Sequence, residues 1–162
     1  MAEVSIANVL LVRPECEIAF ELHDRQDGRG LKLSLFGGRV DPGDASPLDA
    51  IVREIGEETN LSVQPDELIC ITRLRVPATV SRRGDTLDYH LFGAILPFGP
   101  DGTTRLNDLK AIEDGSAREW LTPHVALEDP RLTGVARFVL NTINAVEENA
   151  ELWQTLFRYS SK

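Results

Sequence analysis

The chain has 162 residues, 42% of them hydrophobic, and a formal net charge of −9. This size and composition are typical of one globular domain with a sizeable core, so we expect a single domain over residues 1–162. Polymeric nucleic acid is bound mainly by clustered Lys and Arg, so the acidic balance argues against that partner, and no apolar run is long enough to span a membrane.

The N-terminal part of the chain contains three segments with strand-like patterns, rich in apolar or β-branched residues or alternating in polarity. These segments span residues 4–12, 16–22 and 31–36. The polar, glycine-containing stretch 24–30 predicts a loop between the last two. In the alternating segment, one face holds apolar side chains, and the other holds Glu17, Ala19 and Glu21.

A helix with clear start signals follows this strand region. Ser46 is a good N-cap, Pro47 suits the first helical position, and Asp49 lies three residues after the cap. Asn60 tolerates the left-handed backbone conformation, so we expect the helix to end there.

The second half of the chain again mixes strand and helix patterns. Strands are expected at 67–76, 86–96 and 117–121, the first two joined as a hairpin, and helices from about 131 and about 149. The stretch 97–115 is rich in Pro, Gly and Asp, which predicts mostly irregular structure. The whole pattern predicts an α/β protein with a mixed sheet flanked by helices.

Cys16 and Cys70 are the only cysteines, and both fall in segments predicted to be strands. We expect buried structural thiols at both positions. The N-terminus also lacks the basic and apolar regions of a secretory signal. These features indicate a reducing, cytoplasmic location.

The predicted helix carries three carboxylates, Glu54, Glu57 and Glu58, on one face, because residues three and four positions apart are neighbours. Like charges at this spacing repel by roughly a few tenths of a kcal/mol per pair. A bound cation would explain the arrangement, and Mg²⁺ prefers such oxygen ligands together with substrate phosphates. The pattern indicates a site for one to three metal ions and hydrolysis at a phosphorus–oxygen bond. A solvated acidic helix is the alternative.

The whole stretch 37–61, GGRVDPGDASPLDAIVREIGEETNL, resembles the Nudix box of the MutT-like hydrolases. The family pattern begins at Gly38 and ends with the run REIGEETNL at residues 53–61. The chain departs from that pattern in three places. Asp44 stands where the family has Glu, one extra residue precedes the helix cap, and Asn60 replaces a glycine.

The resemblance implies a Nudix fold, an α/β/α sandwich, and a pyrophosphohydrolase that uses Mg²⁺, with Mn²⁺ as an alternative. Glu57 and Glu58 would be metal ligands, joined by the Gly38 carbonyl. Glu54 would be either a further ligand or the base that activates water, so Glu54, Glu57 and Arg53 form the expected catalytic set. Arg53 is expected to orient a glutamate through a charge-assisted hydrogen bond.

Candidates for substrate binding lie outside the box. Arg73 and Arg75 could bind phosphates or a nucleotide, with solvated strand charges as the alternative. Glu113 lies in a loop before Trp120, where relatives often supply an additional carboxylate. Pro77 slightly favours an ADP-ribose-like substrate by its distance from the box.

We therefore expect cleavage of a diphosphate linkage in a nucleoside diphosphate derivative, such as a nucleotide, an ADP-ribose-like compound or a nucleotide sugar. The alternative is a catalytically inactive Nudix-fold module that binds nucleotides or has a regulatory role. Dimers are common among relatives, so a homodimer is a further expectation for the assembly.

Overall fold

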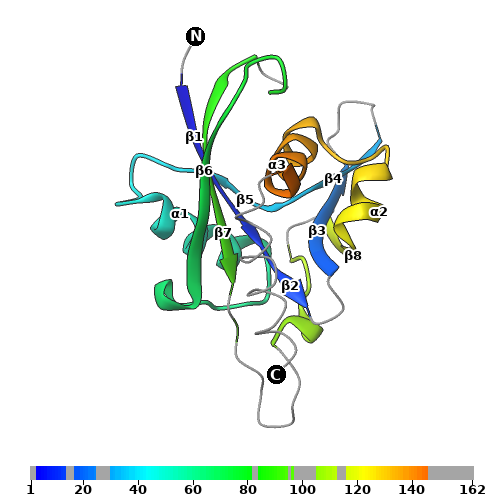
Figure 1. Cartoon of the computed structure of the whole chain (residues 1–162). Helices are drawn as coiled ribbons and strands as arrows, with labels where there is room; N and C mark the ends of the chain where they lie inside the picture. Colours follow the sequence, from blue (N-terminus) through cyan, green and yellow to red (C-terminus); the bar gives the residue numbers. More distant parts are fainter. Residues whose placement is uncertain are drawn as a thin grey trace.

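The computed structural model describes residues 3–13, 17–24, 30–81, 84–94, 96, 105–112 and 116–145. These residues form two β-sheets and three α-helices (Figure 1). The prediction of an α/β fold with a mixed sheet flanked by helices is confirmed. None of the described helices is long and apolar enough to cross a membrane.

The first sheet has the strand order β5-β1-β7-β6. Its central strands β1 and β7 run parallel, whereas β5 pairs with β1 and β6 pairs with β7 in antiparallel fashion. The bounds of these strands are β1 Glu3–Leu10, β5 Phe36–Arg39, β6 Leu68–Val76 and β7 Thr86–Ala94. The sheet is therefore mixed, and β6 and β7 form the predicted hairpin.

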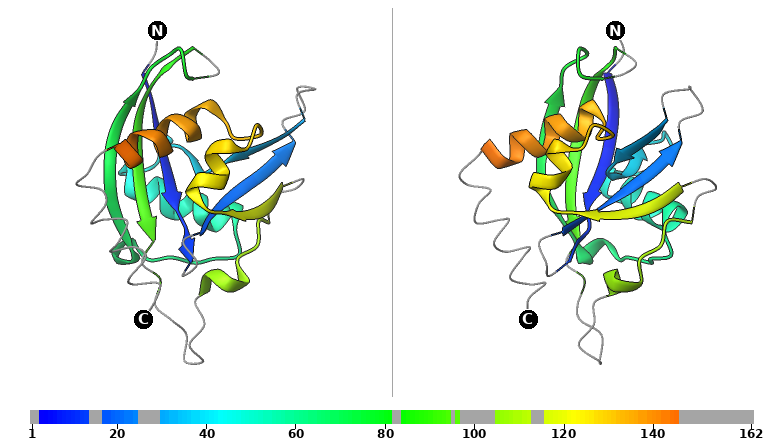
Figure 2. Two further views of the ribbon diagram at one scale, coloured as in Figure 1. Left: turned by 45° about the vertical axis from the view of Figure 1, so that its right-hand side comes forward. Right: turned by 90° about the vertical axis from the view of Figure 1, so that its right-hand side faces the viewer.

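The second sheet is built around β3, Glu17–Asp24, which pairs antiparallel with each of its neighbours. The neighbours are β2 Val12–Arg13, β4 Leu31–Ser34 and β8 Ser116–Leu121. Its strands lie beside the first sheet and are inclined to it, as the two turned views show (Figure 2). This second sheet forms the other wall of the site described below.

Two segments predicted as single strands each cross from one sheet to the other. The segment 4–12 divides into β1 and β2, and the segment 31–36 divides into β4 and β5. At the second crossing, the buried Asn8 side chain donates to the carbonyls of Leu35 and Phe36, at 3.0 and 2.8 Å. Asn8 thereby supplies partners for carbonyl groups at the point where the chain changes sheets.

Helix α1, Pro47–Glu58, starts as predicted, with the Ser46 hydroxyl accepting from the Asp49 amide. Ala50, Ile51 and Ile55 are fully buried and pack in the core on one face of the first sheet. Helix α3, Gly134–Ala145, and the short helix α2, Pro123–Glu128, pack in a second core that includes Tyr89 and Leu91 of β7. The first sheet thus has helices on both faces, as the layered prediction required.

The end of α1 differs from the prediction. Thr59, not Asn60, is the C-cap, and it has an extended backbone rather than a left-handed one. Asn60 instead bonds through its side chain to the Asp108 carbonyl and the Lys110 amide, at 2.9 and 2.7 Å. It therefore attaches the segment after the short 3-10 helix η2, Arg105–Asp108, to the end of α1.

Cys70 was expected to be buried, and this prediction is wrong, because Cys70 is exposed. It lies on β6, the edge strand of the first sheet, where the register shifts between Cys70 and Thr72. An edge position and a bulge both turn side chains away from the core. Cys16 and the helix predicted from about 149 lie outside the described residues.

Candidate active site

Gly37 and Glu58 connect the start and the end of the motif stretch. The Gly37 amide donates to Glu58 Oε2 at 2.7 Å. Gly37 has a φ of +119°, and a Cβ there would lie 2.8 Å from Asn8 Cα and 2.9 Å from Ile51 Cδ1, besides meeting the Ala7 carbonyl oxygen. Only glycine fits this position, because both the backbone conformation and the close approach of β1 exclude a side chain.

Gly38 provides the space in which Glu54 lies. A Cβ at Gly38 would lie 2.5 Å from Glu54 Oε1, so the carboxylate packs directly against the glycine backbone. The Glu54 side chain is only 14% exposed. Burial raises the pKa of Glu54, while the hydrogen bond from Arg53 acts in the opposite direction.

Arg53 lies at the centre of the acidic cluster. Its Nε and Nη2 atoms donate to the two oxygens of Asp44 at 3.1 and 2.9 Å. Its Nη1 atom donates to Glu54 Oε1 and to Glu57 Oε2, each at 3.0 Å. A further bond from Nη2 reaches the Arg39 carbonyl at 3.1 Å. One guanidinium therefore orients the acidic turn and two glutamates of the helix.

The charge balance of this cluster is negative, since a single guanidinium contacts four carboxylates, those of Asp41, Asp44, Glu54 and Glu57. Carboxylate oxygens are hard donors of the kind that Mg²⁺ and Mn²⁺ accept, so the residue types fit a divalent ion. The carboxylates do not converge on one point, because Glu54 and Glu57 meet at Arg53 whereas Glu58 turns to Gly37. Accordingly, within the described residues no three His, Cys, Asp or Glu side chains are grouped to hold a metal.

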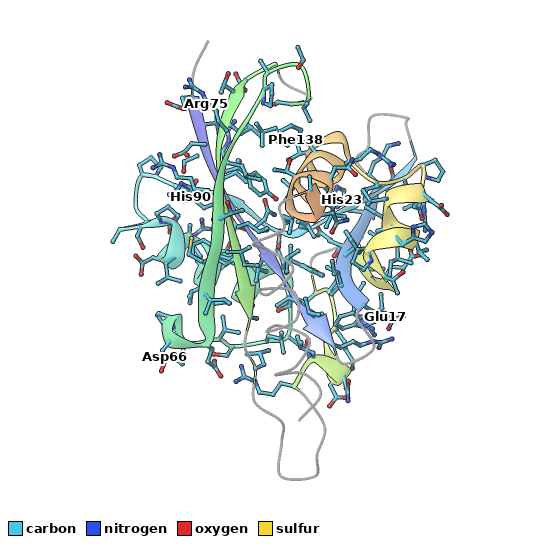
Figure 3. The ribbon with its side chains drawn as sticks, in the orientation of Figure 1. Glu17, His23, Asp66, Arg75, His90 and Phe138 are labelled. Atoms are coloured by element: carbon cyan, nitrogen blue, oxygen red, sulfur yellow. The ribbon has the colours of Figure 1, made fainter. Side chains whose placement is uncertain are left out.

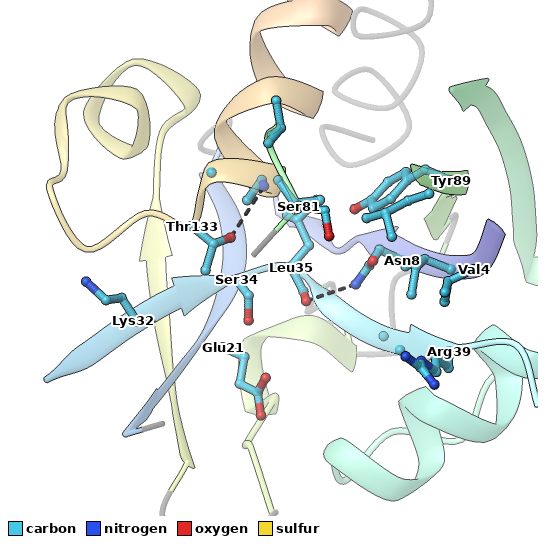
Figure 4. A pocket seen from close by; sticks show the side chains of 18 of the residues that line it. Val4, Asn8, Glu21, Lys32, Ser34, Leu35, Arg39, Ser81, Tyr89 and Thr133 are labelled. Atoms are coloured by element: carbon cyan, nitrogen blue, oxygen red, sulfur yellow. Dashed lines mark hydrogen bonds between the residues drawn. The ribbon is translucent and has the colours of Figure 1, made fainter. Parts of the chain in front are cut away.

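A cavity of about 760 Å³ adjoins the start of the motif stretch (Figure 4). Gly37, Gly38 and Glu58 contribute to its wall. Apolar side chains of the first sheet line another part of it, namely Val4, Ile6, Leu87 and Tyr89. The volume lies in the range of small-molecule sites, which is roughly 300–1,000 Å³.

The other predicted substrate residues lie elsewhere or beyond the described structure. Arg73 pairs with Asp88 at 2.6 Å, and Arg75 lies 3.8 Å from Glu3, both on the first sheet. Among the described residues, the cavity lining includes neither arginine, and Figure 3 separates Arg75 from His23, which does line it. Glu113 falls in a stretch outside the described residues. Their roles in substrate binding remain predictions.

Two polar residues of the cavity wall were not selected from the sequence. Glu21 and His23 both lie on β3 and line the cavity, and His23 Nδ1 is 3.1 Å from Glu21 Oε2. The alternating pattern of 16–22 did place Glu21 on the polar face of its strand. Nothing in that pattern indicated that this face looks into a cavity shared with the motif stretch.

A family model described as the NUDIX domain matches residues 5–141, which include both sheets, the motif stretch and most of α3. The chain belongs to the Nudix family. The stretch 37–61, which resembles the family's box, contains the turn and the helix that Arg53 connects by hydrogen bonds. Among curated proteins, none matches this Nudix chain at a significant level.

Solved structures with the same fold include several MutT and Nudix proteins. The MutT protein from Methanosarcina mazei Go1 is 17% identical with a TM-score of 0.61, and the match covers 89% of this chain and 96% of that one. The MutT Nudix hydrolase from Burkholderia pseudomallei is also 17% identical with a TM-score of 0.61, covering 87% and 98%. The E. coli ORF135 protein is 22% identical with a TM-score of 0.57, covering 91% and 96%. At these identities the similarity establishes the fold.

Proposed function

We propose that this Nudix protein is a Mg²⁺-dependent hydrolase, with Mn²⁺ as an alternative, that cleaves a diphosphate linkage in a nucleoside diphosphate derivative. The observation that carries the proposal is the position of Glu58. It ends the helix of the Nudix box, accepts from the Gly37 amide, and lines a cavity of about 760 Å³. The box therefore borders a space large enough for a nucleotide-sized ligand.

The residues fit the chemistry of a phosphoric anhydride. Glu54, Glu57 and Glu58 would hold the metal, with the Gly38 carbonyl as a further oxygen donor. When bound, the metal supplies charge neutralisation on the phosphates and a lower pKa for bound water. Arg53 keeps Glu54 and Glu57 oriented through its two hydrogen bonds of 3.0 Å.

In the proposed reaction, water attacks one phosphorus atom of the diphosphate and the bridging phosphorus–oxygen bond breaks. The electron pair of that bond leaves with the departing phosphate, and a glutamate takes the proton of the water. Glu54 suits the role of base because it lies against Gly38 and is largely buried, although its role as a ligand is the alternative.

A second candidate is a Nudix module that binds nucleotides without hydrolysing them. The observation that favours it is the pairing of Glu54 and Glu57 with Arg53 while Glu58 turns to Gly37. In that arrangement the carboxylates form hydrogen bonds that stabilise the turn and the helix, and they do not bind a cation.

A substrate screen separates the two candidates. The full chain is incubated with nucleoside di- and triphosphates, ADP-ribose, dinucleoside polyphosphates and nucleotide sugars, with Mg²⁺, with Mn²⁺ and with a chelator. Release of phosphate or nucleotide that needs the metal is expected for at least one class. Saturable ligand binding without product from any class would contradict the proposed hydrolase and support the binding module.

A further inference from the structure

Glu21 is a nearly fully buried carboxylate in the cavity wall, with 5% of its surface exposed. It lies on β3, the central strand of the second sheet, where its neighbours in register are Ser34 on β4 and Arg118 on β8. Figure 4 shows Glu21 and Ser34 close together on one side of the pocket, with Leu35 between them and Tyr89. A buried carboxylate is rare unless it has partners, so its surroundings need an explanation.

The partners of Glu21 within the protein are few. In the described part of the chain, His23 is the one residue that bonds to its carboxylate, at 3.1 Å. Cationic residues occur on the neighbouring strands, but neither Lys32 nor Arg118 forms an ion pair with Glu21 among the described residues. An ionised carboxylate accepts about four hydrogen bonds. Glu21 therefore presents acceptor capacity toward the cavity that the described side chains do not use.

Glu21 lies close enough to the Nudix box for one nucleotide to reach both, with its phosphates at the box and its other end at Glu21. Ser34, its register partner, is followed three residues later by Gly37, whose amide holds Glu58. Three extended residues span at most about 11 Å. One ligand in the cavity can thus contact the region of Glu58 with its phosphates and the region of Glu21 with another group.

The remaining walls indicate what that group is. Leu35, which follows Ser34, and Leu132, which bridges to Leu33 of β4, give the cavity an apolar surface on the side of Glu21. Val4, Ile6 and Leu87 continue that surface toward the buried Tyr89. A flat group with an apolar face and polar edges matches these walls. A nucleobase has this character, and a carboxylate reads a base through N–H donors such as an exocyclic amino group.

We infer that Glu21 selects the base of the bound nucleotide by accepting a hydrogen bond from its exocyclic amino group. The inference rests on the proposed function for the place of the phosphates, and it adds a class of substrate, nucleotides with an amino-bearing base. A base with a carbonyl at that position would face the carboxylate with an acceptor and bind more weakly.

The test measures calorimetric dissociation constants of the full chain for nucleoside diphosphates that differ at one substituent. GDP and ADP are each compared with IDP, which lacks the amino group, and CDP is compared with UDP. The wild-type chain binds the amino-bearing member of at least one pair about 10-fold more tightly or better, as expected for a hydrogen bond to a charged acceptor. Glu21→Gln keeps the shape but adds a donor, and reduces that ratio to about threefold or less.

Glu17→Gln is the matched control, because Glu17 lies on the same strand, pairs with Arg13 and is not among the described residues that line the cavity. This variant keeps the wild-type ratio. Equal binding of both members in every pair, no binding of any of the five nucleotides, or an unchanged ratio in Glu21→Gln would overturn the inference.

Phosphate release is followed in the same samples with Mg²⁺. Hydrolysis without base discrimination would overturn the role of Glu21 and leave the proposed hydrolase intact. Discrimination that depends on Glu21, together with no product from any class of the substrate screen, would support the role of Glu21 and contradict the hydrolase.

Discussion

Arg53 binds Asp44 with two hydrogen bonds, from Nε to Oδ1 at 3.1 Å and from Nη2 to Oδ2 at 2.9 Å. This pair connects the acidic turn to the helix. At the position of Asp44 the family pattern has Glu, and this chain has an extra residue after it. The shorter acid still reaches the arginine, and the guanidinium holds the pKa of the Asp44 carboxyl below its ordinary value. The altered turn therefore keeps a contact that orients the glutamates.

The first prediction concerns this pair. Asp44→Asn removes the charge that holds Arg53, so the guanidinium positions Glu54 and Glu57 less well. We expect metal-dependent turnover to fall about 10-fold, the usual scale for residues that orient metal ligands. Asp66→Asn, at an acidic residue of the 3-10 helix η1, Pro65–Glu67, is the control and keeps wild-type turnover. Equal kcat values for Asp44→Asn and the wild type would show that the pair does not position the glutamates.

A second prediction follows from the close approach at Gly37. Gly37→Ala places a Cβ at a φ of +119° and within 2.8 Å of Asn8 Cα. We expect the free energy of unfolding to fall by about 2 kcal/mol or more, and the Tm by about 5 °C or more. Gly43→Ala, in the turn that follows β5 and with open space around it, changes the Tm by no more than about 2 °C. Similar melting temperatures for the two variants would refute the packing described for β1 and β5.

At Gly56, in contrast to Gly37, a substitution by alanine is expected to stabilise the fold. It lies inside α1 and is exposed, and a Cβ added there would meet no atom of a neighbouring described residue within 4 Å. Gly56→Ala should raise the free energy of unfolding by about 0.5–1 kcal/mol, because alanine loses less backbone entropy in a helix. Thermal unfolding should show a higher Tm with turnover unchanged, and a lower Tm would contradict the helix assignment at this position.

The sequence predicted those parts of the fold that depend on local patterns. Ser46 and Pro47 marked the start of α1, and the segment 16–22 was correctly predicted to form a strand, although Ala19 and Glu21 on its predicted polar face are buried. The crossings between the two sheets were missed, because an apolar run has the same appearance whichever sheet it joins. The buried Asn8, whose bonds support the second crossing, has no local signal in the sequence.

In the candidate site, too, local patterns indicated some residues, whereas others depend on how the strands pack. Glu54, Glu57 and Glu58 were selected because their spacing on a helix is itself informative, and their role as metal ligands stays a prediction. Glu21 and His23 were not selected, since their position in the cavity wall depends on which elements face β3 in the folded chain. The exposure of Cys70 depends on its edge position and on a register shift, and both are properties of strand pairing.

A pH-dependent stability is expected from Asp129, the C-cap residue of α2. Its carboxylate accepts from the Arg131 amide and side chain at 2.6–3.2 Å, and these bonds lower the pKa of Asp129 from 3.8. A lowered pKa stabilises the folded state above about pH 4, and this contribution is lost as the pH falls below 3.8. Asp129→Asn should therefore lower the Tm at pH 7 by about 2–4 °C.

Melting curves of both proteins between pH 7 and pH 3 check this expectation. The difference in Tm narrows below about pH 4, because the carboxyl group of Asp129 then takes up a proton in the unfolded wild-type chain while the folded chain still holds the charged form. A difference that stays constant over the whole range would exclude the ionised carboxylate as its cause.

The central claim is that the glutamates of the Nudix box bind the metal that supports hydrolysis. The most direct measurement is Mg²⁺-dependent product release by the double variant Glu57→Gln, Glu58→Gln, on the best substrate of the screen, with Glu128→Gln on α2 as the control. The double variant is expected to lose turnover by about 100-fold or more while keeping its fold by circular dichroism, and the control keeps full turnover. Full metal-dependent turnover in the folded double variant would contradict the account.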